Sequence, residues 1–144
     1  MMRDQFFDGL IRQLRSIPVG LRVDSWLIRE YPDLAEQQRT VINKQLAENL
    51  SALGPDVRDM APDVILNANL GMNAAFALFW SRTWNEKPLS GPYMATGHLS
   101  VGESLLKLWD ELNYQPVHDK DLIEAWGDHL GLAGWFEFVP YRLG

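Results

Sequence analysis

The chain has 144 residues with a formal net charge of −6 at pH 7, and 47% of its residues are hydrophobic. This length suits one domain, the apolar fraction argues against a disordered chain, and the negative charge disfavours a nucleic-acid binder, which needs a basic face toward phosphates. The chain has no cysteine, which excludes a disulfide framework and a thiolate zinc site, so we expect a single domain over residues 1–144 that packing alone stabilises.

The N-terminal part of the chain predicts two helices separated by a break. Apolar residues recur every three or four positions within residues 4–17, which is the spacing of a helix with one buried face. Pro18 and Gly20 interrupt this pattern, because proline lacks a backbone donor and glycine tolerates unusual backbone angles. A second, short helix is expected to end at Glu30, since Pro32 pushes the residue before it out of helical geometry.

Residues 34–53 are expected to form a long helix. Asp33 and Glu36 have the spacing of a capping box, in which the first side chain accepts from free N–H groups of the first turn and the second side chain reaches back. Gly54 and Pro55 end this helix, because glycine suits a left-handed cap and proline cannot continue the hydrogen-bond ladder.

The stretch from Pro62 to Trp84 has the densest apolar content in the chain. Apolar residues occur on every side of it, which is typical of a helix that its neighbours cover all round. Asn67, Asn69 and Asn73 interrupt a run that is already short for a bilayer, which needs about 20 apolar residues, so we expect a core helix and no membrane span. Asn69 and Asn73 lie one turn apart, and we expect them to bond across a buried helix contact, with a ligand pocket as the alternative.

After this helix the chain predicts a long irregular segment over residues 85–99, which contains two prolines and two glycines. Long loops in compact domains often carry function. Two more helices are expected, at 100–113 with Ser100 as its cap and at 119–130 with Gly131 at its end.

Together these elements predict an all-α fold, a compact bundle of about six helices around a buried central helix at roughly 62–84. Residues 135–139 alternate aromatic and polar side chains like a strand, and Pro140 restricts this tail to an edge strand or an extended arm. The N-terminus lacks the apolar core and the cleavage site of a secretory signal, so we expect a cytoplasmic protein.

The sequence contains no motif with the spacing of a catalytic or metal site. His98, His118 and His129 have carboxylates near them, but no pair shows the His-x-x-x-His repeat that places two imidazoles on one helix face. The sequence also lacks a Gly-x-Ser-x-Gly turn and a glycine-rich phosphate loop. Acids on the outer faces of amphipathic helices are usually solvated rather than catalytic. We therefore expect no catalytic residue, metal ion or cofactor.

Most of the negative charge lies in the C-terminal third. Seven acids and two lysines fall between Glu103 and Asp128, where tryptophans and an aromatic tail accompany them. Acidic surfaces speed the encounter with basic partners, and aromatic rings supply binding energy. We expect a non-catalytic interaction module, a small acidic inhibitor or immunity-type protein that binds a basic protein partner. The residues expected to bind this partner are Trp109, Asp110, Glu111, Asp121, Glu124, Asp128, Phe136 and Tyr141.

Two other functions stay open from the sequence. The first is an enzyme or small-molecule binder with a pocket between the central helix and the 85–99 loop, where convergent polar groups would act on a ligand. The second is a structural subunit that self-associates into a homo-oligomer. The residues expected to line the first alternative's pocket are Asn73, Trp80, Trp84, Tyr93 and His98.

Overall fold

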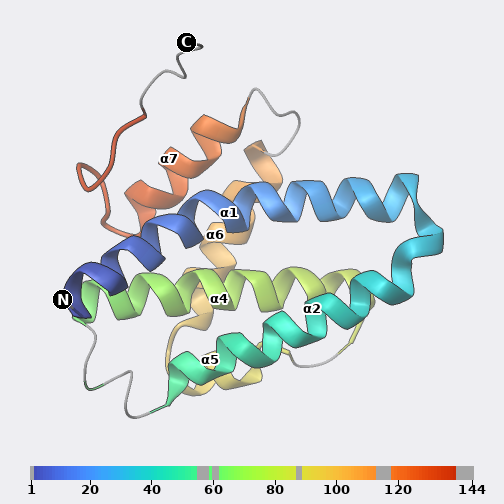
Figure 1. The fold of residues 1–144 in the computed structure, drawn as a ribbon, viewed down its shortest axis with the longest axis horizontal. Helices are drawn as coiled ribbons and strands as arrows, with labels where there is room; N and C mark the ends of the chain where they lie inside the picture. The colour runs from blue at the N-terminus through green and yellow to red at the C-terminus, as the bar shows by residue number, and fades with distance from the viewer. Residues whose placement is uncertain (1, 55–58, 60–61, 87–88, 113–117, 139–144) are drawn as a thin grey trace.

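The structure is a computed structural model that describes residues 2–54, 59, 62–86, 89–112 and 118–138, apart from the side chains of residues 2–4 and 52. Within these ranges it is an all-α bundle with six α-helices and no strand, as the sequence predicts (Figure 1). The elements in chain order are α1 (Met2–Glu30), η1 (Pro32–Leu34), α2 (Ala35–Leu50), η2 (Ser51–Leu53), α4 (Asp63–Trp84), α5 (Gly91–Ala95), α6 (Leu99–Leu112) and α7 (Asp119–His129).

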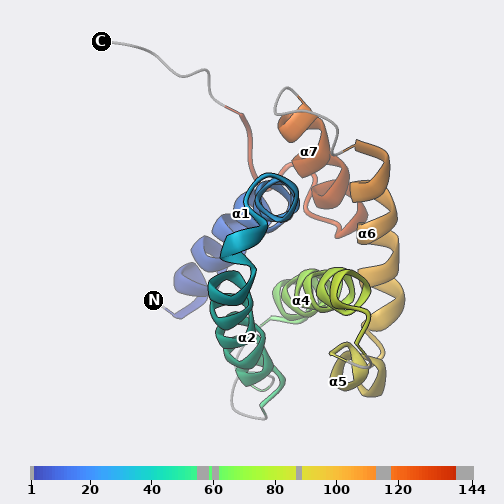
Figure 2. The same ribbon diagram turned by 90° about the vertical axis from the view of Figure 1, so that its right-hand side faces the viewer.

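α4 is the central helix of the bundle. Eight consecutive residues, 70–77, are buried, because their mostly small and apolar side chains meet a neighbouring helix on each side. α1 and α2 cover one side of α4, and α6 covers the other (Figure 2). Within the described part of the chain, α4 is the one helix long and apolar enough to cross a membrane by length and composition, and 72% of its most apolar window is buried inside the fold.

The contact between α4 and α6 is close because small residues form it. A Cβ atom added at Gly102 would lie 2.7 Å from Ala74 Cβ and 2.9 Å from the backbone of the same turn of α4. Gly71 meets Val101 of α6 in the same way, at 2.7 Å from its Cγ1 atom. Larger side chains at these positions would push the two helices apart.

The predicted break at Pro18 is wrong, because α1 continues through it from Met2 to Glu30. Proline removes one helical hydrogen bond, but Leu14 and Leu21 on either side of it are both buried, as is Pro18 itself. The Pro18 carbonyl oxygen accepts a hydrogen bond from Trp109 Nε1 at 3.0 Å. Packing of this segment into the core therefore overrides the local preference of the sequence.

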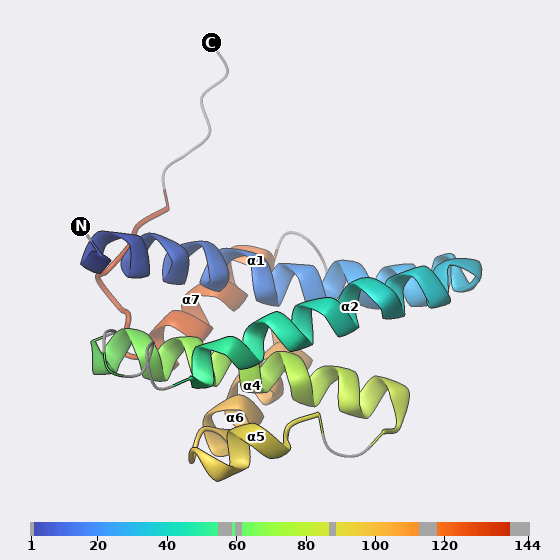
Figure 3. The ribbon, with the colours of Figure 1, turned by 60° about the horizontal axis from the view of Figure 1, so that its bottom comes forward.

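α2 returns along α1 and α4 from the far end of α1 (Figure 3). The predicted capping box is not formed, since Leu34 takes the cap position and no side chain caps the first turn. Ile42 and Leu46 are the buried residues of α2. Arg39 holds α2 to the end of α4 by an ion pair with Glu86 and by stacking its guanidinium 4.3 Å from the centre of the Trp84 ring.

The C-terminal elements pack beside α6 and α1. Ser100 lies inside α6, which begins at Leu99, so it is not the cap that the sequence suggests. The end of α7 is as predicted: Gly131 has φ +75°, and its N–H and that of Leu132 bond back to the carbonyls of residues 128 and 127. The predicted strand is absent from residues 135–138, and the rest of that tail lies outside the described residues.

Candidate functional site

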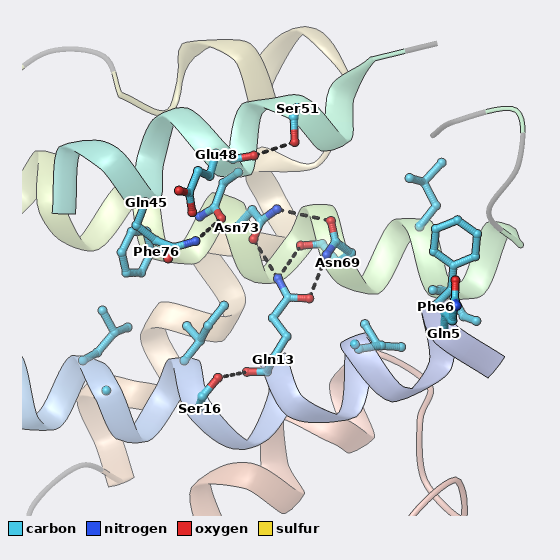
Figure 4. Close-up of a pocket in the computed structure, with 18 of the residues that line it drawn as sticks. Gln5, Phe6, Gln13, Ser16, Gln45, Glu48, Ser51, Asn69, Asn73 and Phe76 are labelled. Atoms are coloured by element: carbon cyan, nitrogen blue, oxygen red, sulfur yellow. Dashed lines mark hydrogen bonds between the residues drawn. The ribbon is translucent and has the colours of Figure 1, made fainter. Parts of the chain in front are cut away.

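A cavity of about 570 Å³ lies between α1, α2 and α4 (Figure 4). Its volume is within the range of about 300–1,000 Å³ typical of small-molecule sites. Ten of the residues that line it belong to one face of α1, from Gln5 to Asp24. The others come from α2, η2 and α4: Gln45, Glu48, Asn49, Ser51, Ile65, Leu66, Asn69, Asn73 and Phe76.

Three side-chain amides form a closed ring in the wall of this cavity (Figure 4). Gln13 Nε2 donates to Asn73 Oδ1 at 2.7 Å, Asn73 Nδ2 donates to Asn69 Oδ1 at 3.2 Å, and Asn69 Nδ2 donates to Gln13 Oε1 at 2.8 Å. Each amide thus donates one bond and accepts one within the ring. The ring joins α1 to α4 and confirms the predicted bonding of Asn69 and Asn73 across a helix contact.

The amide ring has hydrogen-bonding capacity left over. A primary amide offers two donors and two acceptor lone pairs, and the ring uses one of each. Gln13 places a second bond on the Asn69 carbonyl oxygen at 3.3 Å. The remaining groups of the ring belong to residues that line the cavity. Asn73 is 3% exposed, so the protein itself holds this side chain in place.

The rest of the cavity wall combines apolar and acidic side chains. Leucine, isoleucine and phenylalanine residues of α1 and α4 form its apolar part. On the α2 side Gln45 Nε2 donates to Asn49 Oδ1 at 2.7 Å, next to Glu48. Asp24 lies toward the C-terminal end of the α1 face, where Gln38 of α2 donates to its backbone oxygen at 3.2 Å. Burial raises the pKa of Asp24, and the Gln38 hydrogen bond partly offsets this shift.

Two glycines on α1 widen the cavity. Gly9 and Gly20 both line it, and a Cβ atom added at either would meet no atom within 4 Å. Glycine inside a helix costs roughly 0.5–1 kcal/mol relative to alanine. Neither position has a close packing contact that requires glycine. The two glycines therefore keep space open along α1, at this cost in helix stability.

The described lining of the cavity consists of apolar, uncharged polar and acidic side chains. Among its described lining residues there is no histidine, lysine or arginine, and the two serines donate to helix carbonyls, Ser16 to Arg12 and Ser51 to Glu48. In the ranges that the structure describes, no group of three or more histidine or acidic side chains could hold a metal ion. The arrangement offers hydrogen bonds and apolar contact to a ligand.

The structure buries one residue of the predicted partner surface. Trp109 is 5% exposed and packs edge-on against Phe79 of α4, with ring centres 5.3 Å apart. Its indole N–H is bonded to Pro18, so this ring belongs to the core and is not available to a partner. The apolar spacing of α6 that places Trp109 on the inner face is the reason.

Asp110, which belongs to that surface, and Asp119, which lies in the same acidic segment, each have a partner within the chain. Asp110 forms a two-point ion pair with Arg82, at 2.9 and 3.0 Å. Asp119 forms a second such pair with Arg22 of α1, at 2.9 and 2.8 Å. Both pairs neutralise negative charge that the sequence assigns to the surface.

The remaining predicted partner residues stay at the surface or fall outside the described residues. Glu111, Asp121, Glu124 and Asp128 are exposed, and Glu124 has Lys120 at 3.8 Å. Phe136 is half-buried, and its ring lies where a Cβ atom at Gly127 would approach within 2.9 Å. Tyr141 lies outside the described residues.

The observed cavity lies away from the 85–99 loop, where the sequence suggests a pocket. Trp80 and Tyr93 are core residues, and burial raises the pKa of Tyr93 to about 12, which keeps its phenol neutral. The Nε2 atom of His98 lies 2.9 Å from Asn67 Oδ1, and neither residue lines the cavity. Of the five residues expected there, Asn73 alone lines the observed cavity.

The sequence analysis missed the α1 side of the site. Small and polar residues recur along one face of α1, and these residues are Gly9, Gln13, Ser16, Gly20 and Asp24. Their spacing of three or four positions is the available signal. The predicted break at residues 18–20 hid it, because it divided the stripe between two helices.

Comparisons of the chain with protein-family models, with curated proteins and with solved structures found no match. Fold, cavity and surface charge are therefore the observations from which function is inferred.

Proposed function

We propose that this protein is a non-catalytic binding protein that holds a small, partly polar organic molecule in the cavity between α1, α2 and α4. The observation that carries the proposal is the ring of Gln13, Asn69 and Asn73 in the wall of a cavity of about 570 Å³. Ligand sites of this kind place a few fixed polar groups within mostly apolar walls.

The amide ring is not needed simply to join two helices. Buried amides cost free energy unless they are hydrogen-bonded, and apolar side chains of similar shape can serve a purely structural contact about as well. The two cavity glycines carry a cost in helix stability. Both features belong to the same cavity, which supports a role in binding.

Filling the cavity tests this proposal. Gly20→Leu adds a side chain where nothing lies within 4 Å, and leucine favours the helix. Saturation-transfer NMR against a panel of small metabolites is expected to show ligands that bind the wild type and not Gly20→Leu. Ala47→Leu, on the exposed side of α2 and outside the cavity lining, is the matched control and is expected to bind like the wild type. A panel in which every ligand binds both variants equally would contradict a cavity site.

The protein-partner function has one specific observation in its favour. Asp121, Glu124 and Asp128 are exposed and lie three and four residues apart on α7, on one face of the helix. The exposed rings of Trp135 and Phe138 follow in the tail. An acidic stripe beside aromatic rings would suit a basic protein, as in an inhibitor or immunity-type protein.

Charge reversal tests the partner surface. Asp121→Lys, Glu124→Lys and Asp128→Lys together are expected to abolish salt-sensitive capture of a basic protein from a host lysate, with less than about 0.5 kcal/mol change per site in unfolding free energy. The control variant reverses three exposed acids elsewhere, Asp8, Glu30 and Glu36. If the two triple variants capture the basic protein equally, α7 is not the contact surface.

A further inference from the structure

The electrostatic character of the cavity restricts its ligand. Among the lining residues that the structure describes, two carry a carboxylate, Asp24 and Glu48, and none carries a positive charge. Asp24 is half-buried, so its charge acts more strongly than one at an open surface, whereas Glu48 lines the cavity from an exposed position. An anionic ligand would meet repulsion there, whereas a cationic ligand would meet two counter-charges.

The two carboxylates lie at separate positions along the cavity. Gln38 of α2 donates to the backbone oxygen of Asp24, and Glu48 lies ten residues farther along α2, about 15 Å at a rise of 1.5 Å per residue. Asp24 lies three helical turns farther along α1 than Gln13, about 16 Å at a rise of 1.5 Å per residue. A compact cation therefore meets one carboxylate at a time, and an elongated cation spans both.

The cavity wall between the two carboxylates is apolar and open. Ile17 and Leu21 of α1 and Phe76 of α4 line it, and Gly20 adds free space beside them. This surface suits a chain of methylene groups. Elsewhere in the cavity wall the second lone pairs of the amide oxygens of Gln13 and Asn69 add acceptors for N–H groups.

We propose that the cavity binds a linear aliphatic polyamine, with ammonium groups at Asp24 and Glu48 and methylene segments against the apolar wall between them. This inference rests on the proposed ligand-binding function and assigns its ligand class. A divalent metal ion fits less well, because it requires several oxygen ligands around one point, and no such cluster occurs in the described ranges.

Isothermal titration calorimetry with putrescine, spermidine and spermine tests the assignment. Affinity for the wild type is expected to rise with the number of amines, because longer polyamines reach both carboxylates. Asp24→Asn and Glu48→Gln are each expected to weaken spermine binding at least tenfold, and Gly20→Leu to remove it. Asp8→Asn and Glu36→Gln remove one exposed charge each outside the cavity lining and are expected to change affinity less than twofold. Circular dichroism checks that every variant is folded.

Three results would overturn the polyamine assignment. The first is no heat of binding with any of the three amines. The second is an equal loss of spermine affinity in the cavity variants and in the surface controls, which would indicate nonspecific charge attraction. The third is binding of the neutral probe 1,8-octanediol as tightly as spermine and with the same sensitivity to Gly20→Leu. That third result would contradict the polyamine assignment but would still be consistent with small-molecule binding in the cavity. If the cavity binds no small molecule, Gly20→Leu would not change the result of the metabolite panel.

Discussion

The two sides of α4 differ in how they meet their neighbours. Toward α6 the helix presents alanines and Gly71, and Gly102 of α6 fits against Ala74 with no room for a Cβ atom. Toward α1 and α2 the same helix presents Asn69, Asn73 and Phe76 to a cavity. One helix thus has a dry, closely packed side and a polar, open side.

This difference separates stability from binding. Close packing of small residues excludes water and gives dispersion contact over the whole interface. The side of α4 that carries the amides has less of this dispersion contact, and it holds fixed hydrogen-bonding groups next to free volume. Glycine shows the contrast directly, since Gly102 is required by contact and Gly20 has open space around its Cα.

The largest expected effect tests the packed side. Trp109→Ala removes a buried ring that contacts Phe79 and bonds to Pro18, so we expect a loss of about 3–5 kcal/mol in unfolding free energy. Urea denaturation followed by circular dichroism measures it. A loss below 1 kcal/mol would mean that Trp109 is a surface ring after all.

A matched pair of glycine substitutions compares the two sides directly. Gly102→Ala places a Cβ atom against the backbone of α4 and is expected to destabilise the protein by about 1–3 kcal/mol. Gly20→Ala adds the same atom on the cavity side and is expected to stabilise it by about 0.5–1 kcal/mol. The midpoints of urea unfolding give both values. Changes of the same sign would show that the two sides are packed alike.

The amide ring is expected to contribute less than the packed tryptophan. Asn73→Ala leaves Gln13 and Asn69 each without one partner, which costs about 1–2 kcal/mol. Replacing all three amides by leucine removes the unpaired groups together and is expected to change stability by less than that, while ligand binding is lost. If the triple variant loses more stability than Asn73→Ala, the ring is a structural requirement and not a binding feature.

The smallest expected effect concerns pH. Burial raises the pKa of Asp24 in the folded state, so the stability that this group contributes is full below its unfolded pKa and is lost as pH rises through its folded pKa. Asp24→Asn does not titrate. We therefore expect its stability relative to the wild type to increase as pH rises from the ordinary aspartate pKa of 3.8 toward neutrality. Urea unfolding of both proteins at several pH values checks this, and a constant difference would contradict it.

Local pattern was sufficient for most of the fold. The apolar residues on every side of 62–84 predict a covered helix, and Gly131 predicts the end of α7 from its tolerance of positive φ. These features depend on short-range periodicity and on single-residue backbone preferences, which the chain carries before it folds. The same reasoning paired Asn69 with Asn73 across a buried contact.

Long-range packing set the features that the sequence did not reveal. α1 passes through Pro18 because Leu14 and Leu21 are buried on both sides of it, a gain that exceeds the cost of one missing hydrogen bond. Arg82 and Arg22 neutralise Asp110 and Asp119 from distant parts of the chain. A Cβ atom at Gly9 or Gly20 would meet nothing within 4 Å, so the cavity is open along α1, and local pattern does not fix the distance between helices. Periodicity shows which side of a helix turns inward, but a neighbouring helix determines whether that side is packed or left open.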